Sequence, residues 1–210
     1  MLIPPNVLNV VGCASRDAAR YQLCGVFLER KGERTCAATA TDGKTLAHVT
    51  WMEDEQQDFP ERGVNPAPAP KASVIIPTAA VKELAGMAPK KPLKPILRNV
   101  VMDEHALNGT ATFLATELGE TDRRATVKTL EGTYPDASFA IRSCKPKTSV
   151  RVNPFLLIQA LETYVKTLGL KKTGAPDCMI DICGPGPIRI RGAHEDREVT
   201  VLAMPLITKK

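Results

Sequence analysis

Two aspartates stand where a carboxylate could act as a catalytic base. Asp42 lies in the stretch ATATDGKTLAHV (residues 38–49), and Asp136 follows Tyr134 and Pro135. A catalytic carboxylate works with a second acid, a histidine or a nucleophile, and neither aspartate has one at a recognisable spacing. Asp-Gly between two apolar runs is typical of a hairpin turn. We therefore interpret Asp42 as a turn residue and Asp136 as a loop residue, and an enzyme that uses Asp42 or a cysteine remains an alternative.

The spacing of histidine and cysteine argues against a metal site or a cofactor. His48, His105 and His194 are far apart in the sequence, and none has a second ligand type at the short spacing that zinc sites use. The six cysteines include no C-x-x-C pair, and most lie in apolar runs, which is typical of reduced, buried thiols in a cytoplasmic protein. The sequence also lacks a G-x-x-x-x-G-K-[ST] loop, so ATP hydrolysis is not expected. We predict no metal, no cofactor and no catalytic residue.

The composition predicts a folded protein with an aliphatic core. Of 210 residues, 43% are hydrophobic but only 4% are aromatic, so Val, Leu, Ile and Ala must fill the interior. No apolar run reaches the roughly 18 residues of a membrane span. The first residues, MLIPPNVLNVVG, lack the basic segment of a signal peptide, so we expect no secretion signal.

Basic residues gather in clusters although the net charge is only +5. The stretch Met52–Gly63 contains five acidic residues and one basic residue, so the rest of the chain is more basic than the total indicates. The clusters are Lys82, Lys90, Lys91, Lys94 and Arg98; Arg142, Lys145, Lys147 and Arg151; and Lys166, Lys171 and Lys172. Such clusters suit a phosphate backbone, and ordinary solubilising surface is the alternative.

Three segments of the chain share one pattern. LIPPNVL begins at residue 2, VIIPTAAV at residue 74 and VRVNPFLL at residue 150. Each reads as a short strand, a proline-containing break and the start of a helix, because proline is tolerated in the first helical turn. In the third segment, Asn153 before Pro154 is a typical helix N-cap. The starts lie about 72 to 76 residues apart, which indicates an internal repeat.

Each expected helix is followed by three strand-like runs. The runs are 25–30, 35–40 and 46–51; 96–102, 111–116 and 124–130; and 178–183, 187–191 and 199–206. We predict an α+β fold of three β-α-β-β-β units, with helices on one side of antiparallel sheets. Two units, 1–51 and 73–142, joined by the linker 52–72, form one domain (1–142), and 147–210 forms a single half-domain unit.

This repeated unit with basic helices resembles the DNA sliding clamps. Four segments are similar, in order, to the middle domain of the bacterial clamp, the β subunit of DNA polymerase III: RYQLCGV (20–26), ATDGKTLA (40–47), SVIIP (73–77) and EGTYPD (131–136). The ending VLAMPL (201–206) is similar to the C-terminal segment of that family. The resemblance covers nearly the whole chain and describes a shortened form, the middle domain plus the second half of the last domain.

The resemblance implies a pocket for short linear peptides of DNA polymerases, clamp loaders and repair proteins. In the family, the hairpin and the C-terminal segment form this apolar pocket. The matching positions here are Leu23, Thr41, Gly43, Lys44, Thr45, Leu46, Leu202, Met204, Pro205 and Leu206. The alternative is that Leu46 and Leu202 are ordinary core residues. The chain also departs from the family at three places. Lys44-Thr45 replaces the family's His-Arg. A proline of the family pattern falls near Arg142, and its last arginine falls near Ile207.

The resemblance also implies sequence-independent binding to double-stranded DNA, because clamps encircle the duplex and touch phosphates with the helices that line the hole. The candidate contacts lie on or after the expected helices, with two near the end of the first: Arg16, Arg20, Lys82, Lys90, Lys91, Lys94, Lys166, Lys171 and Lys172. We therefore expect a non-enzymatic replication or repair processivity factor in the cytoplasm of a bacterial cell or a phage-infected host.

An odd number of units predicts self-association. In clamps two units pack helix against helix, so the third unit would expose an apolar helix stripe and a sheet edge. Two chains that pair their third units would bury both. Family rings contain twelve units, so we expect a homo-tetramer, with a dimer as an open half-ring. The alternative is an interaction module that forms no ring, keeps the pocket and competes with a full clamp for partners.

Overall fold

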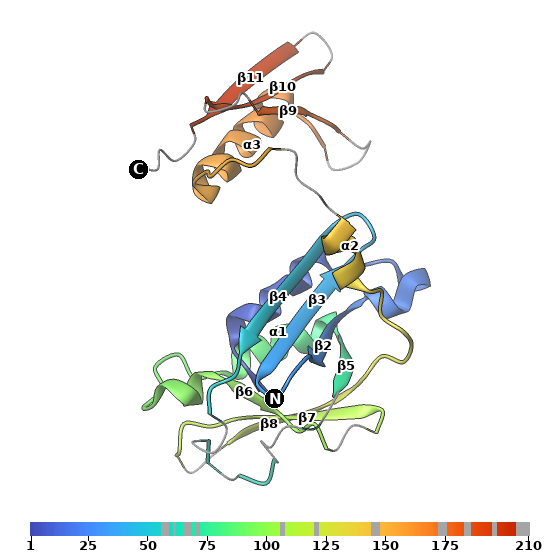
Figure 1. Cartoon of the computed structure of the whole chain (residues 1–210), viewed down its shortest axis with the longest axis vertical. Helices are drawn as coiled ribbons and strands as arrows, with labels where there is room; N and C mark the ends of the chain where they lie inside the picture. The colour runs from blue at the N-terminus through green and yellow to red at the C-terminus, as the bar shows by residue number, and fades with distance from the viewer. Residues whose placement is uncertain are drawn as a thin grey trace. The chain divides into compact units, whose positions relative to one another are not determined.

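A computed structural model gives the fold of the chain (Figure 1). It describes residues 1–55, 59–60, 62–64, 69, 72–105, 108–119, 122–143, 148–171, 176–182, 186–194 and 197–204. The chain divides into two compact units, the first unit Met1–Arg142 and the second unit Ser143–Lys210. Among the described residues, no helix is long and apolar enough to cross a membrane.

The first unit contains two four-stranded antiparallel sheets. One has the strand order β4-β3-β2-β5 and consists of β2 (Gly25–Arg30), β3 (Thr35–Thr41), β4 (Leu46–Met52) and β5 (Ser73–Pro77). The other has the order β1-β6-β7-β8 and consists of β1 (Leu2–Ile3), β6 (Val100–Met102), β7 (Thr110–Ala115) and β8 (Arg123–Lys128). These strands are rich in the β-branched residues Val, Thr and Ile, which pack well on a pleated surface.

Each sheet includes one strand from the other repeat. β5, the first strand of repeat two (73–142), pairs with β2 of repeat one (1–51), and Ile76 lies opposite Val26. β1, the first strand of repeat one, pairs with β6 of repeat two, and Ile3 lies opposite Val100. The two repeats are therefore joined by a reciprocal exchange of strands, and neither sheet is complete without the other repeat.

The helices of the two repeats pack against each other in the core. η1 (Pro5–Cys13) is a 3₁₀ helix, and α1 (Thr78–Met87) is an α-helix that contacts it. Val81 and Leu84 lie one helical turn apart on the buried face of α1, as the helical period requires. They share an aliphatic cluster with η1 and with the inward side chains of both sheets, such as Leu28 and Phe113.

A buried ion-pair cluster also joins the two repeats. Arg30, at the end of β2, contacts the carboxylate of Glu104 after β6, with Nη2–Oε1 at 2.6 Å and Nε–Oε2 at 2.9 Å. Its Nη2 also lies 2.7 Å from Oε2 of Glu53, and all three residues are buried. Burial alone would raise the pKa of Glu104, but the hydrogen bond from Arg30 and the other positive neighbours hold this pKa below its usual value.

The second unit contains one long helix and a three-stranded antiparallel sheet. α3 (Pro154–Leu168) begins at the N-cap Asn153, whose side chain accepts a hydrogen bond from the Phe155 N–H at 3.0 Å, as predicted. It ends at Gly169, which has a φ of +65°. The sheet has the order β11-β10-β9 and consists of β9 (Met179–Ile182), β10 (Ile188–His194) and β11 (Arg197–Ala203). Figure 1 shows α3 lying across one face of this sheet.

The α+β fold of three repeats is confirmed, with some differences in its elements. The expected first helix is a 3₁₀ helix, and the expected strand 96–102 begins as another, η4 (Pro95–Arg98), before β6. Two further helices, η2 (Ala18–Leu23) and α2 (Ala137–Ser143), were not expected. Of the expected linker 52–72, the structure describes residues 52–55, 59–60, 62–64, 69 and 72.

Candidate functional site

Side chains at the tip hold the hairpin between β3 and β4. Oδ1 of Asp42 accepts hydrogen bonds from the backbone N–H groups of Thr45 at 2.6 Å and Lys44 at 2.8 Å, and these bonds keep the pKa of Asp42 below its usual value. Oγ1 of Thr41 donates to the Thr45 carbonyl at 2.6 Å and accepts from the Gly43 N–H at 3.1 Å. Gly43 has a φ of +85°, which glycine adopts without strain. Asp42 is therefore a turn residue, as its sequence context predicts.

Tyr134 supports the base of the hairpin from the other repeat. Its hydroxyl accepts a hydrogen bond from the Thr41 N–H at 3.0 Å. Its ring stacks on Phe27 of β2, with ring centroids 5.2 Å apart and an angle of 6° between the planes. Tyr134 is buried, and this burial raises the pKa of its hydroxyl. The segment EGTYPD thus holds the hairpin in place through a contact between distant parts of the chain.

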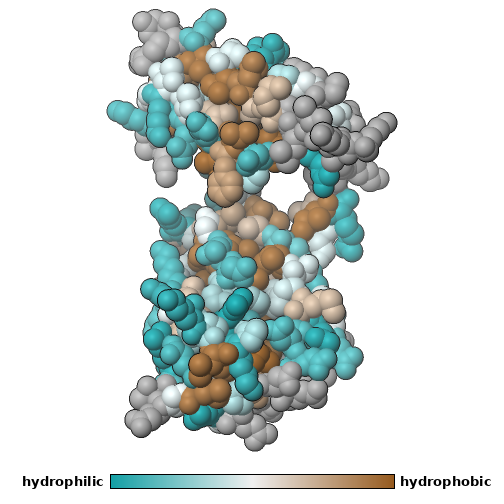
Figure 2. Space-filling view, turned by 90° about the vertical axis from the view of Figure 1, so that its left-hand side faces the viewer, coloured by the Kyte–Doolittle hydropathy of each residue, from teal (hydrophilic) through white to brown (hydrophobic). Residues whose placement is uncertain are grey.

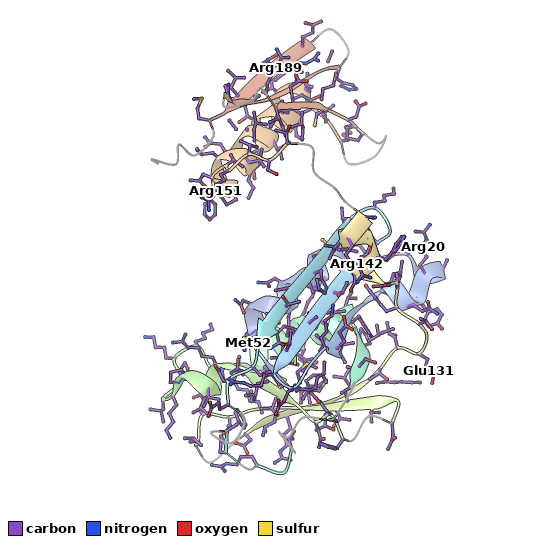
Figure 3. The ribbon with its side chains drawn as sticks, viewed as in Figure 1. Arg20, Met52, Glu131, Arg142, Arg151 and Arg189 are labelled. Atoms are coloured by element: carbon purple, nitrogen blue, oxygen red, sulfur yellow. The ribbon has the colours of Figure 1, made fainter. Side chains whose placement is uncertain are left out.

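η2 places Arg20 beside the hairpin tip (Figure 3). Its Nη1 donates to the carbonyl of Asp42 at 3.4 Å, and it would lie 2.9 Å from a Cβ added to Gly43. η2 is a separate helix because Asp17 caps it by accepting from the Ala19 N–H at 3.0 Å. Arg20 therefore does not lie at the end of the first helix, as the sequence predicted, but on the surface around the hairpin.

The apolar candidates divide between the two units. Leu46 lies at the hairpin tip with 39% of its surface exposed, and Leu23 ends η2 and is half-buried. Leu202 on β11 and Met204 just after it are 56% and 59% exposed in the second unit. Pro205 and Leu206 lie outside the described residues. Leu46 and Leu202 are thus both exposed in their own units.

Arg16 and Lys82 both line one cavity in the first unit. The cavity has a volume of about 490 Å³, and its other lining residues include Val11, Ser15 and Thr78. It lies where η1, α1 and the segment after η1 meet, so both cations stand at one surface of the paired helices. Two positive side chains that line a cavity together with hydroxyl groups can accept an anionic group such as a phosphate.

The remaining basic candidates that the structure describes are exposed in their own units. Lys90, Lys91 and Lys94 follow α1, and Lys171 follows α3. Lys166 on α3 pairs with Glu162 one turn away at 3.0 Å, which is an ordinary surface ion pair. Lys172 lies outside the described residues.

Comparison with known proteins shows which fold this architecture is similar to. The chain is 30% identical over 140 residues to the β sliding clamp of Synechocystis sp. (strain ATCC 27184 / PCC 6803 / Kazusa), which covers 64% of this chain and 33% of the relative. The Bacillus subtilis DNA polymerase sliding clamp superposes with a TM-score of 0.69 at 19% identity, over 98% of this chain and 48% of that structure. The chain has the fold of a bacterial sliding clamp.

Other solved clamps agree with this result. The DNA polymerase III β subunit of Pseudomonas aeruginosa gives a TM-score of 0.67 at 19% identity, over 98% of this chain and 50% of that structure. No protein-family model matches the chain. The chain spans about a third of the curated clamp and about half of the solved ones, so it resembles a shortened clamp.

Other polar groups of this clamp fold have structural roles. Oδ1 of Asp136 accepts from the N–H groups of Ser138 and Phe139, at 2.8 and 3.3 Å, at the start of α2. His48 lies 2.8 Å from the Thr39 hydroxyl, and its burial and the nearby Lys31 lower its pKa. In the part of the chain that the structure describes, no group of three His, Cys, Asp or Glu residues could hold a metal ion.

Two residues at the hairpin were missed as site residues. Tyr134 appears in the sequence only as part of a matching loop, and its contact with Thr41 joins residues 93 positions apart. Gln22 packs close to Gly132 of the same loop. No local pattern predicts such a contact. The signal that could have indicated it is the presence of two clamp-like motifs, ATDGKTLA (40–47) and EGTYPD (131–136), which the contact between Thr41 and Tyr134 joins.

Proposed function

We propose that the chain is a non-catalytic, clamp-like processivity factor that holds a DNA polymerase or a repair protein on duplex DNA. The observation that carries this proposal is the sliding-clamp fold over 98% of the chain. The helices η1 and α1, with Arg16 and Lys82 at their common cavity, would face the phosphate backbone. Such contacts neutralise phosphates without reading bases, so binding would not depend on sequence.

The hairpin supports the second half of the proposal, the docking of partner peptides. Its tip is rigid, because Asp42, Thr41 and Tyr134 fix its backbone through the hydrogen bonds described above. The exposed Leu46 offers an apolar contact, and Gly43 lets a partner approach the backbone closely. Leu202 and Met204 offer further exposed apolar surface to the same kind of partner, and methionine adapts to varied side chains.

Binding to a fluorescein-labelled duplex of random sequence tests the DNA contact. We expect Lys82→Glu to weaken binding at least tenfold and to reduce the slope of log Kd against log salt by about one. Lys128→Glu is the matched control, because Lys128 is exposed on β8 and its neighbours Ala125 and Val127 turn to the core. Equal loss for both variants, or none for either, would contradict a DNA surface at η1 and α1.

Titration with a labelled clamp-binding peptide from a bacterial replicative polymerase tests the hairpin. We expect Leu46→Arg to weaken peptide binding at least tenfold while the thermal midpoint stays unchanged. Leu118→Arg is the matched control, because Leu118 is also 39% exposed but lies in another loop. Peptide binding without DNA retention would favour the interaction module that competes with a full clamp, and the reverse would place the function on DNA alone.

A further inference from the structure

The first unit shows how two repeats of this chain complete each other. The first strand of each repeat extends the sheet of the other, as the pairs Ile3–Val100 and Ile76–Val26 show. The same exchange brings η1 and α1 into contact. A single repeat therefore has two unfilled positions, a place for a strand beside the first of its three consecutive strands and a place for a helix beside its own.

Repeat three has the same order of elements, but among its described residues no strand lies beside β9 and no second helix lies beside α3. The sheet ends at β9 among the described residues, although β2 and β6, the strands in the same place, each pair with an exchanged strand. The segment Val150–Val152, which corresponds to β1 and β5, contains only an isolated bridge at Val152. Residues 144–149 separate α2 from this segment in the sequence, and so few residues cannot contain another repeat.

The edge of the sheet exposes side chains that should be in a core. Ile180 and Ile182 of β9 lie opposite Ile190 and Ile188, which are buried under α3, so all four point to the same face. Yet Ile180 is 55% exposed and Ile182 is 44% exposed. On β2 of the first unit, the corresponding inward residues Val26 and Leu28 are both 0% exposed, because β5, α1 and the other repeat cover them.

α3 also has a second apolar stripe, which is exposed. Ala160, Tyr164 and Leu168 form its buried stripe, on its own sheet. Phe155, Ile158 and Val165 form another, at 77%, 53% and 42% exposure. Figure 2 shows apolar side chains at the surface of the second unit, which lies at the top of that view. In the first unit, α1 contacts η1, the helix of the other repeat.

We propose that the third repeats of two copies of this chain pair by reciprocal strand exchange. Val150–Val152 of each copy extends the β9 edge of the other, and the exposed stripes of the two α3 helices pack together. A second copy fits because each copy supplies both the strand and the edge, so one two-fold axis satisfies both. The charged side chains Asp181, Arg189 and Arg191 lie on the opposite face of the sheet and would stay in water.

The pairing would produce a domain like the first unit from two half-domains. It would bury Ile180, Ile182 and the α3 stripe, which otherwise form an exposed apolar area of the kind that marks an interface. It would also pair the backbone groups along β9, which removes an open sheet edge. This inference depends on the fold alone and not on DNA or peptide binding.

Light scattering after size exclusion, on the full chain over a concentration series, is the first test. We expect about 45 kDa, twice the 22.7 kDa of one chain, or a multiple of that dimer. Ile180→Arg should halve the mass. Met179→Arg is the matched control, because Met179 is 56% exposed on the same strand but points to the other face. A wild-type monomer at all concentrations, or equal effects of both variants, would overturn the proposal.

Two further measurements guard against misfolding and against another interface. Phe155→Arg should also halve the mass, and it should not unfold the repeat because Phe155 is 77% exposed. Amide hydrogen exchange of residues 179–182 should slow as the concentration of the wild-type chain rises, and should stay fast in Ile180→Arg. Association without protection of β9 would overturn strand exchange, and a normal mass for Phe155→Arg would overturn the helix contact.

Discussion

Repeats one and two differ from repeat three in the pairing of their first short strand, which in repeats one and two extends the sheet of the other repeat. All three have a helix followed by three antiparallel strands, and their sheets have the same internal order. In the first unit the exchanged strands bury Val26 and Leu28 completely, whereas Ile180 and Ile182 of the second unit remain about half exposed. The same kind of residue at the same place thus becomes core or surface according to whether a second repeat is present.

The two units also place their ion pairs differently. Arg30, Glu53 and Glu104 are buried where two repeats meet, whereas Asp181 and its partners Arg189 and Arg191 lie on an open sheet face. A buried charge without its partner is costly, but an exposed pair contributes little because water and salt screen it. Stability therefore depends more strongly on a single charged side chain where two repeats bury it than where it lies on an open sheet face.

The largest expected effect is at the buried cluster. Arg30→Met would remove the buried guanidinium that pairs with both Glu53 and Glu104 and would leave only the N-terminal ammonium of Met1 beside Glu104, so we expect a loss of about 3–5 kcal/mol in the free energy of unfolding. Urea denaturation of the first unit's transition measures it. Arg191→Met is the comparison in the second unit, and it should leave the urea midpoint nearly unchanged. Similar losses of unfolding free energy for both variants would contradict the expected difference between the buried cluster and the exposed ion pairs.

The next effect compares equivalent apolar positions. Leu28→Ala should destabilise the first unit by about 2–4 kcal/mol, because Leu28 is fully buried and its removal leaves a cavity. Ile182→Ala should cost the second unit about 1 kcal/mol under conditions that keep the chain monomeric, since nearly half of Ile182 already contacts water. Thermal unfolding at low and high protein concentration would sharpen the comparison, because pairing of third repeats should raise the cost at Ile182.

A smaller effect is expected where the two repeats meet at the hairpin. Tyr134→Phe keeps the stack on Phe27 but removes the hydroxyl that accepts from the Thr41 N–H. We expect a loss of about 1 kcal/mol in the free energy of unfolding, together with weaker peptide binding. Unchanged affinity with reduced stability would show that the support of the hairpin is structural only.

The smallest effect concerns pH. Burial and Lys31 lower the pKa of His48, so the unfolded chain binds its proton more readily than the folded one. Its contribution to stability is therefore intact above about pH 6.5 and falls as the pH drops below that value. The urea midpoint measured from pH 7.5 to 5.5 should decline less in His48→Gln. A steeper decline in that variant would give the opposite sign and contradict the burial of a neutral ring.

Local patterns predicted the local structure well. Asn153 and Pro154 marked the start of α3, and Asp42-Gly43 marked the hairpin, because each signal acts within a few residues. The strand exchange was not predictable in this way. Apolar residues such as Ile3 and Ile76 indicate that their segments are strands. The apolar pattern does not specify which other strand pairs with each of these segments.

Burial and distant contacts accounted for the other differences. Glu53 belongs to the acidic stretch Met52–Gly63, yet it is buried, and Arg30 reaches it from β2. Arg20 looked like part of the first helix, yet the cap at Asp17 starts a new one beside the hairpin. Both depend on chain segments that meet only after folding, so the composition of the surrounding residues was a poor guide.

The pairing of Leu2 with Val101 has a consequence for synthesis of the protein. β1 leaves the ribosome long before its partner β6 exists, and β2 must wait for β5. Closing loops of this length is slow compared with forming local hairpins. The nascent chain therefore carries apolar strand edges until both repeats have emerged, and this interval is when chaperones or premature pairing with a neighbouring chain would act.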